Sequence, residues 1–185
     1  MSTTPRTYPW ASQFGGQPVT FRLMRADDKE LFKKFIRSLP QEDNYYLLLD
    51  VNKDSAIDAW MDGIESGRTL SVIAVEDNQI VGYCNLHTND TPWIRHVGEI
   101  RMSVSPAYRG RGLGKTLANE VFAIAKARGL QKIWARMAAN QKSAQNVFES
   151  LGFHAEALLA DFVRHPNGRT DDLVIMSYDV TGFVN

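Results

Sequence analysis

The sequence feature that most constrains the fold is a glycine-rich turn that joins a strand pattern to a helix pattern. Val97–Ser105 has the pattern of a strand, which Pro106 closes, and the segment Arg109–Gly114 reads Arg-Gly-Arg-Gly-Leu-Gly. Gly112–Arg128 then carries apolar residues at helical spacing and ends at Gly129. A strand that passes through so short a turn into a helix predicts a sheet with a helix packed on it.

The same turn has the physical properties of an anion site. The first N–H groups of a helix have no partner within the helix, and the helix dipole adds positive charge there. Phosphate groups bind at such termini. Three glycines remove side chains that would hold an anion away from the backbone. Together with three cations they predict a ligand that carries phosphate; the residues are Gly110, Gly112, Gly114, Arg109, Arg111 and Lys115.

Two common phosphate loops do not fit this turn. A nucleoside-triphosphate loop requires glycine at the position that Arg109 occupies, although Gly114, Lys115 and Thr116 match the end of that motif. A dinucleotide loop requires two residues between its last glycines, and only one separates Gly112 from Gly114. Nucleotide hydrolysis and dinucleotide binding are therefore disfavoured.

The remaining patterns predict a mixed α/β chain with a mainly antiparallel sheet. We expect residues 1–18 to form an N-terminal tail and residues 19–185 to form a single domain. The segment Gln41–Val51 carries no clear period. The expected strands are 19–23, 70–76, 80–87, 97–105, 131–137 and two within 153–180, and the expected helices are 27–39, 54–66, 112–128 and 140–151.

Composition narrows the class of protein. The 185 residues suit one domain, and 21 basic residues balance 21 acidic ones, which argues against a general nucleic-acid or polybasic membrane binder. No apolar run is long enough to span a bilayer. The single cysteine, Cys84, cannot form an internal disulfide or a zinc cage. We therefore expect a cytoplasmic protein with no metal and with no nucleic-acid or membrane partner.

The turn also resembles a known signature. Arg109-x-x-Gly112-x-Gly114 is similar to the Gln/Arg-x-x-Gly-x-Gly/Ala sequence with which the GNAT superfamily of N-acetyltransferases binds acetyl-CoA, and the later Leu151-Gly152-Phe153 resembles the end of that family's next helix. The resemblance extends over about nine-tenths of the chain. It implies a GNAT-like fold in which a mainly antiparallel sheet contains a central, splayed βαβ unit.

The resemblance also implies roles for individual residues. Backbone groups of the strand would bind the pantetheine arm, the turn from Arg109 to Lys115 would hold the pyrophosphate, and an amide at the start of the later helix would contact pantetheine. Phe148 stands where the family usually has a tyrosine that reprotonates the thiolate. The residues implied for acetyl-CoA are Met102, Ser103, Val104, Arg109, Gly110, Arg111, Gly112, Leu113, Gly114, Lys115, Asn140, Gln141 and Phe148.

The implied reaction is direct attack of a primary amine on the thioester of acetyl-CoA. An alkyl ammonium has a pKa of about 10 and must lose a proton first, so a base is needed. Glu99 ranks first because it lies on the donor-binding strand, and His96 and His87 follow. The acceptor, a small molecule or a peptide, is not identified, and a homodimer is possible. The alternative function, suggested by Phe148, is a non-catalytic acetyl-CoA-binding or sensor module.

Overall fold

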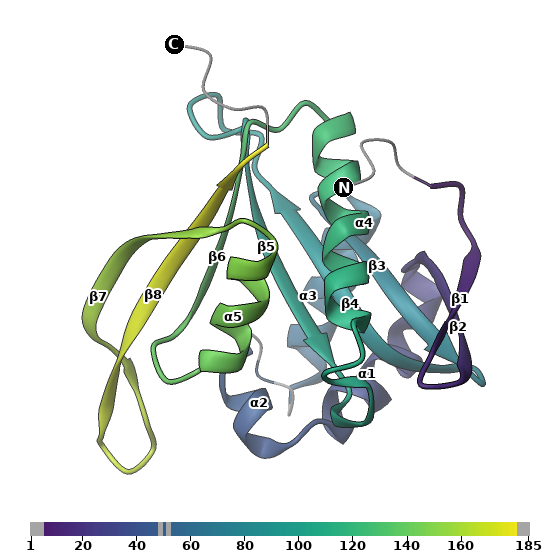
Figure 1. The fold of residues 1–185 in the computed structure, drawn as a ribbon, viewed down its shortest axis with the longest axis horizontal. Coiled ribbons are helices and arrows are strands. Elements are labelled where there is room, and N and C mark those ends of the chain that lie inside the picture. Colours follow the sequence, from purple (N-terminus) through teal and green to yellow (C-terminus); the bar gives the residue numbers. More distant parts are fainter. Residues whose placement is uncertain (1–5, 48–49, 51–52, 181–185) are drawn as a thin grey trace.

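The computed structural model describes residues 6–47, 50 and 53–180. Its strands, along which apolar side chains alternate, form one twisted sheet (Figure 1). The spatial order is β1-β2-β3-β4-β5-β6-β8-β7, and every neighbouring pair is antiparallel except β5–β6. The strands are β1 (Trp10–Phe14), β2 (Gln17–Leu23), β3 (Thr69–Glu76), β4 (Gln79–Thr88), β5 (Val97–Val104), β6 (Lys132–Ala138), β7 (His154–Arg164) and β8 (Thr170–Asp179).

Helices cover both faces of this sheet. The elements are the helices α1 (Lys29–Ser38), α2 (Gln41–Tyr45), α3 (Asp54–Glu65), α4 (Leu113–Ala127) and α5 (Lys142–Ser150), with short 3₁₀ turns at Ala26–Asp28 and Pro106–Tyr108. In Figure 1, α4 and α5 lie in front of the sheet, and α1 and α3 lie behind it. The expected mixed α/β fold with a mainly antiparallel sheet is confirmed.

Each face of the sheet has its own hydrophobic core. Leu113 and Leu117 of α4 pack with Ile100 of β5 on one face. Phe32 of α1 and Ile57 of α3 pack on the other. Successive strand residues point to opposite faces, so each strand supplies both cores. Helix α4 and helix α3 are therefore held on opposite sides of β5.

The two parallel strands pair over a short distance only. Val97, Gly98 and Glu99 of β5 align with Lys132, Ile133 and Trp134 of β6, and beyond these three pairs the two strands separate. Helix α4 connects β5 to β6 and completes the splayed βαβ unit that the resemblance implies. The result is a wedge between β5 and β6, narrow at Glu99 and open toward the turn that begins α4.

The N-terminal segment differs from the expected tail. Residues 10–23 form a β1–β2 hairpin that pairs with β3, and Gly15 and Gly16 turn it with φ of +61° and +85°. Trp10 stacks on Phe21 at 4.2 Å between ring centroids, and its indole N–H donates to Glu120 of α4. Because these anchors are distant in sequence, local pattern does not reveal them. Residues 1–5 of the expected tail lie outside the described residues.

The segment without a clear period also acquires structure. Residues 41–45 form α2, which Pro40 precedes, and Tyr46 follows it. Residues 48–49 and 51 of that segment, and residue 52 after it, lie outside the described residues. The other predicted helices and strands are present, with ends shifted by one or two residues in most cases.

Candidate active site

The turn before α4 provides an uncapped helix N-terminus. Gly110 and Gly112 have φ of +70° and +84°, a backbone conformation that favours glycine. Gly112 is the N-cap residue, and no side chain caps the helix. A Cβ added at Gly112 would meet no atom within 4 Å. The N–H groups of the first turn of α4 are therefore open to an anion, as the sequence predicts.

The cations of the turn differ in their contacts. Arg109 donates from Nε to the Val104 carbonyl and pairs through Nη2 with Asp43 of α2. Arg111 lies against Gly15 of the hairpin turn, and Lys115 is exposed. An anion at this terminus therefore competes with Asp43 for Arg109, while Arg111 stands between the turn and the hairpin.

The strand assigned to pantetheine borders the wedge. Met102, Ser103 and Val104 are each half-buried, and all three pair with β4 on one side. On the other side, no pair joins them to β6 in the described part of the chain. This strand edge faces the open wedge, so its backbone groups, apart from the Val104 carbonyl that accepts from Arg109, are available to an extended chain.

The two amides at the start of α5 already have partners. Asn140 donates to Asp171 of β8 at 2.8 Å and bonds the Tyr46 hydroxyl. Gln141 accepts from the backbone N–H of Ala138 at 2.9 Å. Both lie at the end of β6, on the far side of the wedge from β5.

Phe148 is a core residue. It is 5% exposed and meets Phe153 edge to face at 5.0 Å between centroids. A phenyl ring has no proton to donate, so this position cannot supply a general acid.

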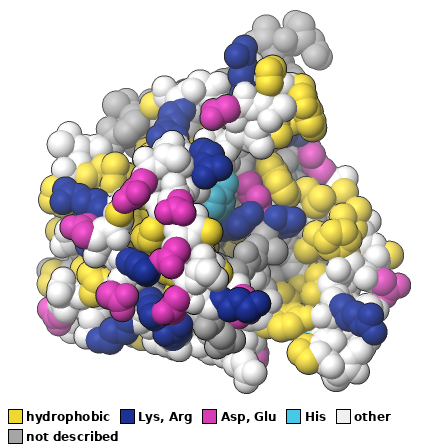
Figure 2. All heavy atoms as spheres, turned by 180° about the vertical axis from the view of Figure 1, so that it is seen from behind, with side chains coloured by type: hydrophobic (Ala, Val, Ile, Leu, Met, Phe, Trp, Pro, Cys, Tyr) yellow, Lys and Arg dark blue, Asp and Glu magenta, His cyan; other side chains and the backbone are white. Residues whose placement is uncertain are grey.

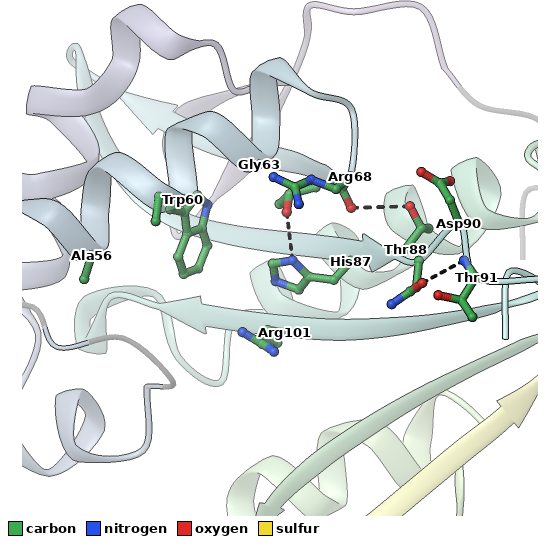
Figure 3. Close-up of a pocket in the computed structure, with 12 residues that line it drawn as sticks. Ala56, Trp60, Gly63, Arg68, His87, Thr88, Asp90, Thr91 and Arg101 are labelled. Atoms are coloured by element: carbon green, nitrogen blue, oxygen red, sulfur yellow. Dashed lines mark hydrogen bonds between the residues drawn. The ribbon is translucent and has the colours of Figure 1, made fainter.

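A cleft opens on the face of the sheet that carries α3 (Figure 3). It has a volume of about 580 Å³ and lies between Trp60 of α3, His87 of β4 and Arg101 of β5. A second cleft of about 340 Å³ shares His87 with it and continues to Glu99 and Trp134. These volumes suit a small ligand. Figure 2 shows this face, where basic side chains gather beside a histidine side chain at a hollow.

Glu99 lies at the narrow end of the wedge and is held by two arginines. Arg101 donates to it from Nε at 2.9 Å and from Nη2 at 2.8 Å, and Arg136 of β6 donates from Nε at 3.1 Å. Burial favours a raised pKa for this carboxyl, but the bonds and charges of the two arginines outweigh it and lower the pKa. Glu99 is therefore ionised at neutral pH, and its proton affinity is reduced.

The two histidines have different positions. His87 Nδ1 bonds the Thr69 hydroxyl at 2.9 Å, and its Nε2 is buried and has no partner among the described residues. Burial first, and then the charge of Arg101, lower the pKa of His87 to about 4, so the ring is neutral at pH 7. His96 is exposed and is absent from the lining of both clefts. The structure brings Glu99 together with His87 rather than with His96.

Local sequence reasoning missed a cluster at the open end of the wedge. Tyr45 of α2 stacks on His165 at 5.1 Å between centroids, and His165 Nε2 lies 2.6 Å from Asp171 of β8. Tyr46 bonds Asn140 in the same cluster. These residues come from three distant segments. The only available signal was the Tyr45-Tyr46 pair in a polar stretch.

The described residues offer neither an activated cysteine nucleophile nor a metal site. Cys84 is fully buried, and burial raises the pKa of its thiol, so it is not an activated nucleophile. Among residues 6–47, 50 and 53–180, no group of three His, Cys, Asp or Glu side chains is arranged to hold a metal ion. In the same residues, no helix has the length and apolar character needed to cross a membrane.

These features define a class: a mixed α/β protein in which two parallel strands separate beside an uncapped helix N-terminus, with two adjoining clefts on the face of the sheet that carries α3. Comparison with known proteins makes the class specific. Residues 30–153, more than half of the chain, match the model of the Acetyltransferase (GNAT) family. The chain therefore belongs to the GNAT family of acetyltransferases, which use acetyl-CoA, and it is an N-acetyltransferase.

Individual relatives are distant. The chain is 23% identical over 134 residues to the [ribosomal protein bS18]-alanine N-acetyltransferase of Haemophilus influenzae, a match that covers 70% of this chain and 88% of the relative. An N-acetyltransferase from Staphylococcus aureus Mu50 has a TM-score of 0.78 at 15% identity, covering 88% of this chain and 99% of that one. The yncA protein of Salmonella typhimurium, solved with its cofactor acetyl-CoA, has a TM-score of 0.71 at 20% identity, covering 90% and 96%. The two structural matches agree with the fold described above.

Proposed function

We propose that this protein transfers the acetyl group of acetyl-CoA to a primary amine by direct attack, within the single domain of residues 19–185, to which β1 adds an edge strand. The observation that carries the proposal is the wedge. Strands β5 and β6 separate beyond Glu99, and the separated edge of β5 leads into the uncapped N-terminus of α4. One extended ligand can therefore contact the strand edge with its amide arm and the helix with its pyrophosphate.

In this proposal each part of acetyl-CoA has assigned contacts. The pyrophosphate binds main-chain N–H groups from Arg109 to Lys115, with the side chain of Arg109 as an added cation. The pantetheine arm lies along Met102–Val104, and a backbone N–H of that strand donates to the developing oxyanion. Asn140 and Gln141 border the arm from the β6 side, and Phe148 supports it from the core.

The amine must lose its proton before it attacks. We propose Glu99 as the proton acceptor, through a water molecule, because it lies at the narrow end of the wedge and lines the second cleft. Its two arginine partners weaken it as a base, so neutral His87, which lines both clefts, is the next candidate. His96, the second residue that the sequence suggests, is exposed and would act only from the rim.

Departure of the thiolate needs no acid at position 148 in this proposal. Phe148 leaves the thiolate to be protonated by water or by another group. The relatives named for alanine acetylation on a ribosomal protein suggest an N-terminal alanine as one acceptor to test, beside small-molecule amines. We further propose that the protein acts in the cytoplasm.

The test combines binding and turnover. Calorimetry should detect acetyl-CoA binding to the wild type, and thiol release should follow when amines are added. Gly112→Val should weaken acetyl-CoA binding at least tenfold, because its side chain occupies the space in front of the helix. Gly168→Val is the matched control, since Gly168 has the same φ of +84° in the distant β7–β8 turn. Equal donor affinity in both variants would place the donor elsewhere.

The alternative function is a non-catalytic acetyl-CoA sensor, and Phe148 is the observation in its favour. It predicts tight acetyl-CoA binding, no thiol release with any amine, and no effect of Glu99→Gln on a residual rate. Thiol release that falls in Glu99→Gln while donor binding is kept would exclude the sensor.

A homodimer is also proposed, with the edge strand β7 as its interface. Leu158 and Phe162 on this strand are 62% and 60% exposed. An edge strand with exposed apolar side chains favours pairing with a second strand. Light scattering should give twice the chain mass for the wild type, and Leu158→Lys should restore the monomer.

A further inference from the structure

The narrow end of the wedge carries more positive charge than its carboxylate balances. Glu99 is the only acidic side chain that Arg101 and Arg136 contact among the described residues. Two guanidinium groups against one ionised carboxylate leave one unit of positive charge. His87 adds none, because its lowered pKa of about 4 keeps it neutral at pH 7. The excess charge therefore remains in the protein before a substrate binds.

The arginines also have unused donors. A guanidinium has five N–H groups. Arg136 uses Nε for Glu99, and within residues 6–47, 50 and 53–180 no hydrogen bond holds its two terminal nitrogens. The side chains of Arg101 and Arg136 are 28% and 32% exposed, whereas Glu99 is 11% exposed. The carboxylate is thus covered, while charged donors remain accessible beside it.

Of the two arginines, Arg101 lines a cleft directly, and Arg136 lies beside the smaller cleft through its contacts with Glu99 and with Trp134, whose ring centroid is 5.5 Å from the guanidinium carbon. Arg101 lines the larger cleft, and Glu99, which both arginines contact, lines the smaller one. In the view of Figure 3, Arg101 lies below the ring of His87, and Asp90 lies farther to the right, beyond Thr88. No ion pair joins Arg101 to Asp90 in the described part of the chain, so Asp90 does not neutralise Arg101, and Arg68 adds a second cation to the lining of the larger cleft.

We propose that Arg101 and Arg136 bind an anionic group of the acceptor, so that the preferred acceptors are small amines that carry a carboxylate, such as free amino acids. A planar guanidinium binds a carboxylate through two parallel hydrogen bonds. The same positive charge disfavours a protonated amine and increases the fraction of free, nucleophilic amine. A polyamine, which brings further positive charge, is a poor acceptor for this site. This inference rests on the proposed function.

The experiment compares acceptors that differ only in the anion. Thiol release is measured for a panel of L-amino acids, for the corresponding amino-acid amides, for spermidine and for a peptide with N-terminal alanine. The readout is the ratio of kcat/KM for acid over amide in each protein. Arg136→Gln should lower this ratio about tenfold or more relative to wild type, because it removes a charged hydrogen-bond donor.

Arg128→Gln is the matched control. Arg128 is an exposed arginine just after α4 and lines neither cleft, and the same change there should leave the acid-to-amide ratio as it is in wild type. Calorimetry with acetyl-CoA shows that each variant is folded and binds the donor. Wild type should prefer acids to amides, to spermidine and to the peptide.

The outcomes separate this inference from the function on which it rests. Two results would overturn the role of the arginines and leave the proposed acetyltransferase activity standing. In the first, the wild type acetylates amides, spermidine or the peptide as well as it acetylates acids. In the second, the acid-to-amide ratio of Arg136→Gln equals that of wild type. Absence of thiol release with every acceptor overturns the proposed function instead. Calorimetric binding of amino acids to the CoA-loaded protein then decides the role of the arginines directly.

Discussion

Replacing Glu99 by Gln leaves Arg101 and Arg136 close together without the carboxylate that both contact. Loss of one partner from a buried ion pair costs about 3–5 kcal/mol, whereas exposed pairs contribute about 0–1 kcal/mol. Glu99 is 11% exposed and its partners about a third exposed, so this cluster lies between the two cases. We expect Glu99→Gln to lower the free energy of unfolding by about 2 kcal/mol at pH 7.

The dependence on pH follows from the sign of the pKa shift. The folded state lowers the pKa of Glu99 below its unfolded value of about 4.3. A lowered pKa stabilises the fold fully above the unfolded pKa, and this contribution is lost as pH falls through the folded pKa. The difference between wild type and Glu99→Gln should therefore be constant from pH 6 to pH 8 and should shrink below about pH 4.

Urea unfolding at several pH values is the measurement, with the m-value checked for constancy. Glu149→Gln serves as the control, because Glu149 is exposed on α5 and makes no ion pair among the described residues. The double variant Glu99→Gln/Arg136→Gln should be less destabilised than the sum of the single changes, since it also removes the repulsion between the arginines. An effect of Glu99→Gln no larger than that of Glu149→Gln, or one independent of pH, would refute the ion-pair cluster.

Three further changes test other parts of the structure. Asp43→Asn should tighten acetyl-CoA binding about two- to fivefold by calorimetry, because the uncharged side chain no longer competes for Arg109. Glu42 is the exposed neighbour of Asp43, and Glu42→Gln should leave the affinity unchanged. Asp28→Asn should lower the free energy of unfolding, measured by urea unfolding, by about 3 kcal/mol. The reason is that Asp28 is 4% exposed and accepts two hydrogen bonds of 2.6 Å from Arg22. A change below about 0.5 kcal/mol would contradict the burial of this pair. Gly114→Ala should keep the fold, since its Cβ would meet the Val104 side chain at an ordinary 3.5 Å. It should lower acetyl-CoA affinity if the helix N-terminus holds the donor, and unchanged affinity would contradict that placement.

The sequence predicted the features that depend on neighbouring residues. The strand before Pro106, the glycine turn and the helix after Gly112 are set by local sterics and apolar spacing, and they occur where expected. Alternation also predicted the meander of β3, β4 and β5. The resemblance in Arg109–Gly114 added the separation of the parallel strands, which no local pattern encodes.

Features that depend on distant contacts were not predictable in this way. The β1 strand forms because Trp10 stacks on Phe21 and bonds Glu120, which is 110 residues away. The contact of Arg136 with Glu99 joins residues 37 apart and exists only because β5 and β6 lie side by side. Alternation placed Glu99 and Arg101 on one face, but it could not show that a second arginine would reach the same carboxylate.

The arrangement of the two faces explains how a direct transfer can proceed through a sheet. Helix α4 and the glycine turn lie on one face of β5, and the cleft of Trp60 and His87 lies on the other. A continuous sheet would separate a donor bound on the first face from an acceptor bound on the second. The wedge removes that barrier, because β5 and β6 share no pairs beyond Glu99. On the proposed function, the thioester and the amine therefore meet between the strands. Glu99, Arg101 and Arg136 lie at that meeting point, between the donor on one face of the sheet and the acceptor on the other. A covalent intermediate on the protein is then unnecessary, which agrees with a buried, protonated Cys84 on the neighbouring strand.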